Sequence, residues 1–177
     1  MHCPFMMLFG PLARRSVDGW WESLADKQIL EVGVGMGLVS LLMRIKGANM
    51  TALDIHPEVG DRLRINARRN GCESLEFVCA SWGEPELFLG KFDLIVASDV
   101  LYEPRHVLTL PDFLTSHLMP QGEIYIVDPD RGQVDEFCAA MVGKGFQVER
   151  ENIAERDTDG VPFSGVRLKF FSRNAGV

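Results

Sequence analysis

The sequence predicts an α/β fold, a doubly wound, seven-stranded sheet that is mostly parallel and ends in an antiparallel C-terminal hairpin. Three observations predict it. Apolar, β-rich segments recur at intervals of roughly 20–30 residues with helical patterns between most of them, which is typical of βαβ units. The first of these segments runs directly into a glycine-rich turn, and the last two have no helical pattern between them.

The predicted strands are short apolar segments bounded by turn-forming residues. They cover residues 28–34, 50–55, 75–80, 92–98, 123–128, 146–152 and 166–171. The last strand alternates apolar with basic residues, as a strand with one solvated face does. Only a loop at residues 154–165, rich in Asp, Gly and Pro, separates the last two strands. We therefore expect these strands to pair antiparallel and the loop to lie at the carboxyl edge of the sheet.

Four helices are predicted from apolar residues that repeat every three or four positions. Their expected buried faces are, in chain order, Leu38, Leu41, Leu42 and Ile45; Val59, Leu63 and Ala67; Val107, Leu110, Phe113, Leu114 and Leu118; and Val134, Phe137, Cys138, Met141 and Val142. Pro57 suits the first turn of the second helix, because its missing N–H is no loss there. Pro111 is expected to shorten or bend the third helix. Asp130 and Gln133 are expected to form a capping box before the fourth.

The composition predicts one ordinary globular domain. The chain has 177 residues, of which 46% are hydrophobic and 24% charged, and no linker, repeat or low-complexity segment divides it. A domain usually has roughly 100–200 residues. Residues 1–177 are therefore predicted to form a single domain.

Charge and cysteine usage exclude several classes of function. The net charge of -7 argues against a nucleic-acid binder and against adsorption to an anionic membrane. No apolar run approaches the ~18–20 residues of a membrane span. Arg14 and Arg15 follow the apolar N-terminal stretch instead of preceding it, which is the wrong order for a signal peptide. The four cysteines form no Cys-x-x-Cys pair, so reduced thiols and a cytoplasmic location are predicted.

A glycine-rich turn follows the first strand. Residues 29–38 are Ile-Leu-Glu-Val-Gly-Val-Gly-Met-Gly-Leu, which places Gly33, Gly35 and Gly37 between strand and helix. Glycines at such a turn let a ligand approach the backbone closely, and helix N–H groups then face its anionic part. A nicotinamide dinucleotide site would need G-x-G-x-x-G, and the third glycine comes one residue early here. Glu31, two residues before the first glycine, suits an ammonium better than a pyrophosphate.

Further polar side chains follow the next strands. Asp54 ends the second strand, about 20 residues after the glycines, where a carboxylate can accept both hydroxyls of a ribose. Ligands of such sheets bind outside the carboxyl ends of the strands. One crevice is therefore expected to be lined by the residues at these ends: Glu31, Asp54, Ser81, Trp82, Ser98 and Asp99. An acid beside a glycine turn, a ribose acid and an aromatic side chain fit S-adenosylmethionine.

Glu31–Gly37 together with Asp54 resembles the class I S-adenosylmethionine-dependent methyltransferases, which have a Rossmann-like fold. Residues 91–102, Lys-Phe-Asp-Leu-Ile-Val-Ala-Ser-Asp-Val-Leu-Tyr, resemble the lysine methyltransferase group with a D-x-x-Y motif after the fourth strand. The chain looks most like bacterial relatives of the electron-transfer-flavoprotein β-subunit lysine methyltransferase, sometimes labelled nicotinamide N-methyltransferase-like. The resemblance covers nearly the whole chain, including the final hairpin.

The resemblance implies a role for each matching position. Glu31 would hold the methionine amino group, and Asp54 would bind the ribose hydroxyls. The rest of the implied cofactor-binding set lies beneath the methionine portion, beside the adenine or after the fourth strand: Gly33, Gly35, Gly37, Ile55, His56, Ser81, Trp82 and Ser98. The implied catalytic pair is Asp99, which would orient the incoming nucleophile, and Tyr102, which would present its hydroxyl or ring face to it. No metal ligand is implied.

The chain departs from that group at two places. Relatives commonly carry an acid where Ser81 stands, so the contact to the adenine amino group is expected to differ. Relatives also carry an aromatic-rich segment with a Trp-Pro step before the first helix, where residues 4–11 here are Pro-Phe-Met-Met-Leu-Phe-Gly-Pro. Because the chain begins there, a longer N-terminal arm that binds the acceptor is expected to be absent.

The sequence therefore predicts a methyltransferase that uses S-adenosylmethionine to N-methylate a protein lysine side chain by in-line transfer. Asp99 is expected to orient the amine and not to act as a decisive base, since an anion favours the ammonium form. Two alternatives stay open: transfer to a small amine or heteroaromatic metabolite, and a cofactor-binding domain without transfer activity. A nicotinamide-dependent dehydrogenase is disfavoured by the glycine spacing.

Overall fold

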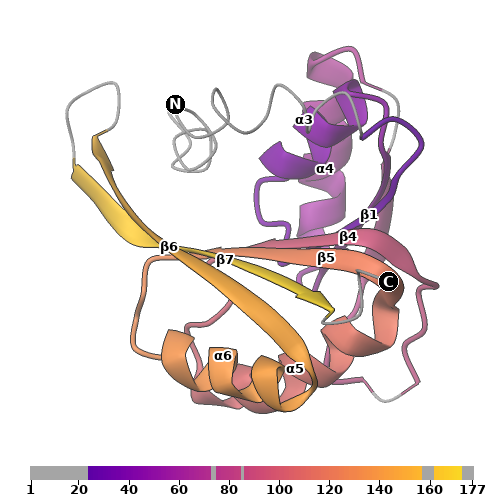
Figure 1. Cartoon of the computed structure of the whole chain (residues 1–177). Coiled ribbons are helices and arrows are strands. Elements are labelled where there is room, and N and C mark those ends of the chain that lie inside the picture. Colours follow the sequence, from indigo (N-terminus) through magenta and orange to yellow (C-terminus); the bar gives the residue numbers. More distant parts are fainter. Residues whose placement is uncertain (1–23, 73–74, 85, 157–161, 173–177) are drawn as a thin grey trace.

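A seven-stranded sheet with the order β3-β2-β1-β4-β5-β7-β6 forms the centre of the computed structural model (Figure 1). The structure describes residues 24–72, 75–84, 86–156 and 162–172. The N-terminal segment 4–11, Arg14 and Arg15 lie outside these residues, as do residues 157–161 of the predicted hairpin loop. The sequence-predicted fold class is confirmed, because the sheet is mostly parallel and its last two strands form an antiparallel hairpin.

The parallel part of the sheet is built from the first five strands. These are β1 (Gln28–Val32), β2 (Asn49–Asp54), β3 (Glu76–Cys79), β4 (Phe92–Ser98) and β5 (Leu118–Asp128). β1 pairs with both β2 and β4, which makes it a central strand; after the exposed Gln28 it is apolar on both faces apart from Glu31. β1 ends two residues before its predicted end, because the backbone turns at Gly33.

The hairpin β6–β7 is longer than predicted. β6 (Phe146–Arg156) and β7 (Pro162–Ser172) pair from Phe146 with Ser172 up to Arg156 with Pro162. Most of the loop predicted at residues 154–165 is therefore strand, and the expectation of a long loop was wrong. The two strands stay paired beyond their apolar residues because each supplies the backbone hydrogen bonds of the other, whatever side chains they carry. Because Asp128, the last residue of β5, pairs with Val166, the hairpin extends beyond the carboxyl edge of the sheet (Figure 1).

Four helices in the described part of the chain cover the two faces of the sheet. α5 (Pro104–His117) and α6 (Val134–Gly143) lie on one face, and α3 (Leu38–Ile45) and α4 (Glu58–Arg69) lie on the other (Figure 1). The α5–α6 face holds the largest apolar cluster, in which helix residues pack on alternate residues of the strands. Successive strand side chains point to opposite faces, so two apolar layers enclose the sheet.

Three of the four predicted helical faces are largely confirmed. In α4 the predicted residues are all buried: Val59, Leu63 and Ala67. In α5 and α6 the predicted core is buried except for half-buried Cys138 and exposed Val142, although Leu118 begins β5 instead of ending the helix. Pro111 does not end α5, because it shares the buried face and packing outweighs the hydrogen bond that it removes.

The predicted buried face of α3 was wrong except at Leu41. The buried residues are Val39, Ser40, Leu41 and Met43, whereas Ile45 is exposed. α3 is apolar on several sides, so its periodicity was ambiguous. The predicted capping box was wrong as well, because α6 is capped at Gln133 without a side-chain hydrogen bond and Asp130 pairs with Arg150.

Candidate active site

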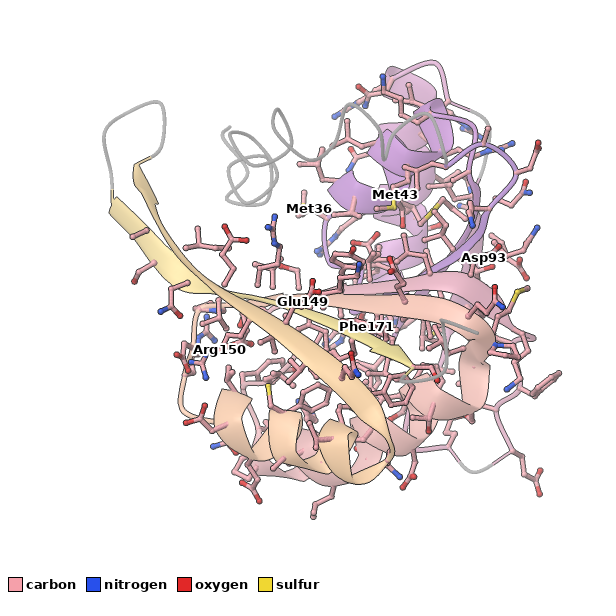
Figure 2. All side chains as sticks on the ribbon, viewed as in Figure 1. Met36, Met43, Asp93, Glu149, Arg150 and Phe171 are labelled. Atoms are coloured by element: carbon pink, nitrogen blue, oxygen red, sulfur yellow. The ribbon has the colours of Figure 1, made fainter. Side chains whose placement is uncertain are left out.

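The side chains singled out in the sequence follow the carboxyl ends of neighbouring strands. The strand order reverses between β1 and β4, since β2 and β3 extend the sheet to one side and β5, β7 and β6 to the other. Open α/β sheets bind ligands at such a switch point. Figure 2 shows Met36, the residue between Gly35 and Gly37, above the sheet on the side of α3. The structure thus brings the glycine turn, Glu31 and Asp54 together beside the segment that follows β4.

The glycine turn between β1 and α3 requires its glycines. Gly33 and Gly37 have φ angles of 73° and 72°, in the left-handed region that favours glycine. A Cβ atom on Gly33 would come within 2.8 Å of Val100 Cγ1, and one on Gly37 would collide with Leu63. The turn therefore packs directly against α4 and against the segment after β4.

Asp54, at the end of β2, is held by the backbone on both sides. Its side chain is 7% exposed. Oδ2 accepts a hydrogen bond from the Gly35 N–H at 3.0 Å, and Oδ1 accepts one from the His56 N–H at 3.0 Å. Each carboxylate oxygen has room for a second donor, so this group can bind two adjacent hydroxyls without moving. Ile55 and His56, which follow it, are exposed.

Glu31 is the most unusual acid in the site. It is 4% exposed, and both the N–H (2.9 Å) and the hydroxyl of Ser40 donate to its Oε2. Burial raises the pKa of Glu31 to about 7, against the two hydrogen bonds from Ser40, and the charge of Asp54 raises it further. Its other oxygen, Oε1, accepts no hydrogen bond from the described residues. A cationic partner at Oε1 would favour the charged form.

Asp99 follows β4 in a conformation that is uncommon for a residue with a side chain. Its φ angle is 52°, and its N–H donates to the Val127 carbonyl at 2.9 Å, which ties it to β5. Arg131 Nη2 donates to Asp99 Oδ2 at 2.8 Å. Oδ1 is buried without a hydrogen-bond partner in the described part of the chain. One oxygen of this carboxylate is thus oriented and the other is left for a donor.

Asp128 lies behind Asp99 at the end of β5. It is fully buried and accepts the N–H groups of Leu101 (3.4 Å) and Asp130 (2.8 Å). Burial raises the pKa of Asp128, against these backbone hydrogen bonds, and the charge of Asp99 contributes in the same direction as burial. Asp128 therefore fastens the segment after β4 to the segment after β5.

His106 contacts both aromatic side chains that the sequence places in the site, Trp82 and Tyr102. His106, in the first turn of α5, is buried and donates from Nδ1 to the Val100 carbonyl at 2.7 Å. Its ring meets Trp82 edge-on, with centroids 4.9 Å apart, and Tyr102 in the same way at 4.8 Å. Trp82 is half-buried against the apolar core, whereas Tyr102 is 51% exposed. His106 thus packs edge-on against the ring of Tyr102.

The remaining predicted residues follow β3 and end β4. The Ser81 N–H donates to Glu84 Oε1 at 2.8 Å, and the Ser81 hydroxyl accepts the Gly83 N–H at 3.2 Å. A carboxylate is therefore present beside Ser81 after all, three residues further along the chain. Ser98 is the half-buried last residue of β4.

A family model described as "Methyltransferase domain" matches residues 12–160. The chain belongs to the methyltransferase domain family. The match confirms that the resemblance of the sequence to methyltransferases reflects membership of the family. The EEF1A lysine methyltransferase 3 of Mus musculus is 30% identical over 142 residues, which are 75% of this chain and 58% of that protein. The histone-arginine methyltransferase METTL23 of Xenopus laevis is 32% identical over 136 residues, 71% of this chain and 58% of that protein. The chain thus spans 58% of the length of these curated relatives.

Solved structures show the same fold. The ribosomal protein L11 methylase of Lactobacillus delbrueckii subsp. bulgaricus superposes with a TM-score of 0.70 at 22% identity, over 98% of this chain and 81% of that chain. The N-methyltransferase NodS of Bradyrhizobium japonicum WM9, in complex with S-adenosyl-L-homocysteine, gives a TM-score of 0.70 at 18% identity, over 97% of this chain and 92% of that chain. At these identities the likeness establishes the fold of the methyltransferase domain and no more.

The sequence assigned no role to four side chains that the structure places in the site. They are Ser40, His106, Asp128 and Arg131. A polar residue within the apolar run of α3 was a signal for Ser40, since a buried hydroxyl needs a partner. Asp128 stands at the end of a predicted strand, which was a signal too. Nothing in the local pattern distinguished Arg131 from any exposed arginine.

The described residues contain neither a candidate metal site nor a candidate membrane-spanning helix. Among them, no group of three or more His, Cys, Asp or Glu side chains could hold a metal ion. No helix in the same part of the methyltransferase domain is long and apolar enough to cross a bilayer.

The buried carboxyl of Glu31 predicts a pH dependence of stability. Because its pKa is raised from 4.5 to about 7, the folded state binds this proton more tightly than the unfolded state does. Its contribution to the free energy of unfolding is therefore largest below pH 4.5 and is lost as the pH rises through about 7. In Glu31→Gln this loss is absent. The free energy of unfolding of the variant minus that of wild type should therefore be larger at about pH 8 than at about pH 5, by on the order of 2 kcal/mol.

Urea denaturation at the two pH values measures this difference. Glu58→Gln, which changes an exposed acid at the start of α4, is the matched control. Equal changes in the two variants would contradict the explanation by burial.

Proposed function

We propose that this methyltransferase domain binds S-adenosylmethionine and transfers its methyl group to the side-chain nitrogen of a protein lysine. The observation that carries the proposal is the pair of buried carboxylates, Glu31 and Asp54, on either side of the glycine turn. Glu31 keeps an oxygen for a cation, and Asp54 is fixed for a pair of hydroxyls. A methionine ammonium and a ribose supply these two partners.

The residues present fit this cofactor. In the proposal, Glu31 Oε1 binds the ammonium, Asp54 binds the ribose hydroxyls, and the backbone at Gly35, beside which a Cβ atom would meet open space, lies beneath the methionine portion. The rest of the proposed set comes from the sequence and lies along the same carboxyl edge: Gly33, Gly37, Ile55, His56, Ser81, Trp82 and Ser98. The NodS structure, which has the same fold, contains S-adenosyl-L-homocysteine.

The acceptor side of the proposal rests on Asp99 and Tyr102. When bound, S-adenosylmethionine supplies an electrophilic methyl group, to which an amine lone pair forms the new C–N bond as the C–S electron pair leaves with the sulfur. Asp99 Oδ1 accepts an N–H of the amine and aims its lone pair, since this oxygen has no partner among the described residues. Tyr102, supported by His106, presents an exposed ring and hydroxyl beside it.

Protein lysine is proposed as the acceptor for two reasons. The D-x-x-Y spacing of Asp99 and Tyr102 resembles that of the lysine methyltransferase group. The curated relatives include EEF1A lysine methyltransferase 3 and protein-lysine methyltransferase METTL21E.

We further propose that residues 1–177 act as one domain in the cytoplasm, supported by the free thiols of Cys72, Cys79 and Cys138.

Two measurements test the proposal. Calorimetric titration with S-adenosylmethionine and with S-adenosylhomocysteine should give micromolar dissociation constants, about -8 kcal/mol. Incubation of the domain with methyl-labelled cofactor and a cell lysate should label a protein that is retained on dialysis. Label in the dialysable fraction would assign a small amine instead, and binding without any labelled acceptor would overturn the transferase assignment. Absence of cofactor binding would overturn the whole proposal.

A further inference from the structure

The ion pair between Asp99 and Arg131 has no evident role in holding the fold together. The two side chains are 43% and 53% exposed, and ion pairs at such positions contribute about 0–1 kcal/mol. The other hydrogen bonds of these two residues use their backbone N–H groups, since the Asp99 N–H donates to the Val127 carbonyl and the Arg131 N–H to the Asp128 carboxylate. Yet the carboxylate that Arg131 contacts has its second oxygen, Oδ1, buried without a partner among the described residues. A buried polar atom left unpaired calls for an explanation.

We propose that Arg131 is a positioning residue of the acceptor site, which fixes Asp99 through Oδ2, leaves Oδ1 for an N–H of the acceptor amine, and balances the charge of Asp99 so that the amine enters as a neutral nucleophile. This inference rests on the proposed function. It adds a residue from the segment after β5 to a pair that the sequence places after β4.

The fixing role follows from the geometry. A carboxylate rotates about its last bond, and a charge-assisted hydrogen bond on one oxygen stops that rotation. Arg131 Nη2 holds Oδ2 at 2.8 Å, while the backbone of Asp99 is already set by its left-handed φ angle and by the Val127 carbonyl. Oδ1 is therefore the oxygen whose direction is defined and whose donor is missing. An N–H group of an amine is the donor that the proposed reaction brings there.

The charge-balancing role follows from the chemistry of the nucleophile. An amine forms a bond to carbon only through its lone pair, so a lysine, whose ordinary pKa is about 10.4, must first lose a proton. A carboxylate within hydrogen-bond distance opposes that loss, because it raises the pKa of the ammonium group by about 1–3. A guanidinium on the same carboxylate offsets part of this effect.

Arg131 is also the cation that contacts Asp99 beside a second acid, Asp128. Within the described residues, the charge of Asp99 acts on Asp128, the buried last residue of β5, and the other charged or titratable groups close to Asp99 or Arg131 in the chain are Tyr102, Glu103 and Asp130. Glu103 is already paired with Arg105, and Asp130 with Arg150. Removing Arg131 therefore leaves Asp99 without its opposite charge.

The test is the pH dependence of methyl transfer in Arg131→Gln. The initial rate is measured from about pH 6.5 to about pH 10 with the lysate fraction that takes label, at saturating cofactor so that titration of Glu31 does not limit binding. In wild type the rate should rise with pH through one midpoint. In Arg131→Gln the midpoint should move up by about one pH unit, which gives about a tenfold lower rate below the midpoint and converging rates above it.

Two further variants separate this role from a structural one. Arg131→Lys keeps the positive charge and should return the midpoint toward that of wild type. Arg150→Gln is the matched control. Arg150, in β6 beside α6 (Figure 2), pairs with Asp130 and with Asp135 of α6, and no ion pair joins it to Asp99 among the described residues. Its midpoint should equal that of wild type. The cofactor dissociation constant of each variant, measured by calorimetry, checks that it is folded.

The possible outcomes are distinct. If Arg131→Gln lowers the rate by the same factor at every pH, or leaves it unchanged, Arg131 has no charge-balancing role and the inference is wrong. If Arg131→Gln does not bind cofactor, Arg131→Met, which also removes the charge, decides in its place: a midpoint about one pH unit above that of Arg150→Gln supports the inference, and a midpoint shared by the two contradicts it. If wild type labels nothing in either lysate fraction, the proposed function fails and this inference with it.

Discussion

Asp54→Ala is expected to weaken the binding of S-adenosylmethionine by at least tenfold, about 1.4 kcal/mol. The substitution removes both acceptors that are proposed to bind the ribose hydroxyls. It also leaves the N–H groups of Gly35 and His56 without the partners that hold the glycine turn to the end of β2. A hydrogen bond to a charged group contributes roughly 1.5–3 kcal/mol, so the loss of even one accounts for the tenfold change. Calorimetric titration of wild type and variant measures it.

Two controls accompany this experiment. Asp61→Ala removes an exposed carboxylate of α4 that pairs only with Arg64 among the described residues, and it should leave affinity unchanged. Asp54→Asn keeps one oxygen acceptor and should fall between wild type and Asp54→Ala. Equal affinities for wild type and Asp54→Ala, with both folded by circular dichroism, would remove Asp54 from the proposed site.

Asp99→Ala is expected to lower the rate of methyl transfer by at least about 100-fold while cofactor affinity stays nearly constant. The carboxylate is proposed to aim the lone pair of the amine, and misplacement of a reacting atom by about 1 Å can cost on the order of 100-fold in rate. Among the described residues, Asp99 hydrogen-bonds to the Arg131 guanidinium through its carboxylate and to the Val127 carbonyl through its backbone N–H, which alanine keeps. The rate is measured with the lysate acceptor and the affinity by calorimetry.

The matched control for Asp99 is Asp112→Ala. Asp112 is exposed on α5 and pairs with Lys144, the C-cap residue of α6, so its loss should change neither quantity. A parallel fall of rate and cofactor affinity in Asp99→Ala would assign Asp99 to the structure of the pocket and not to the acceptor.

The alternation of strands and helices made the fold predictable, because each element carries its own hydrophobic period. β4 has the predicted bounds, and α4 buries the predicted Val59, Leu63 and Ala67. The positions of Glu31 and Asp54 were predictable for a related reason: parallel strands end at one edge, so polar residues that end such strands must gather there.

The features that sequence reasoning missed depend on contacts between distant segments. Ser40 is buried because Glu31, nine residues earlier, needs its hydroxyl, and this places Val39 and Met43 toward the sheet in place of Leu38 and Leu42. Arg131 reaches Asp99 across 32 positions of sequence. The length of the β6–β7 hairpin is set by pairing between strands, which the hydrophobic pattern of either strand alone does not encode.

Because the strand order reverses between β1 and β4, the two proposed functions, cofactor binding and acceptor binding, fall largely to different parts of the polypeptide. Side chains up to Trp82, together with Ser98, are proposed to bind the nucleoside and amino acid parts of the cofactor, and those from Asp99 onward are proposed to contact the acceptor. On this proposal, substitutions from Asp99 onward would change which acceptor is methylated, while the side chains proposed to bind the cofactor stay the same.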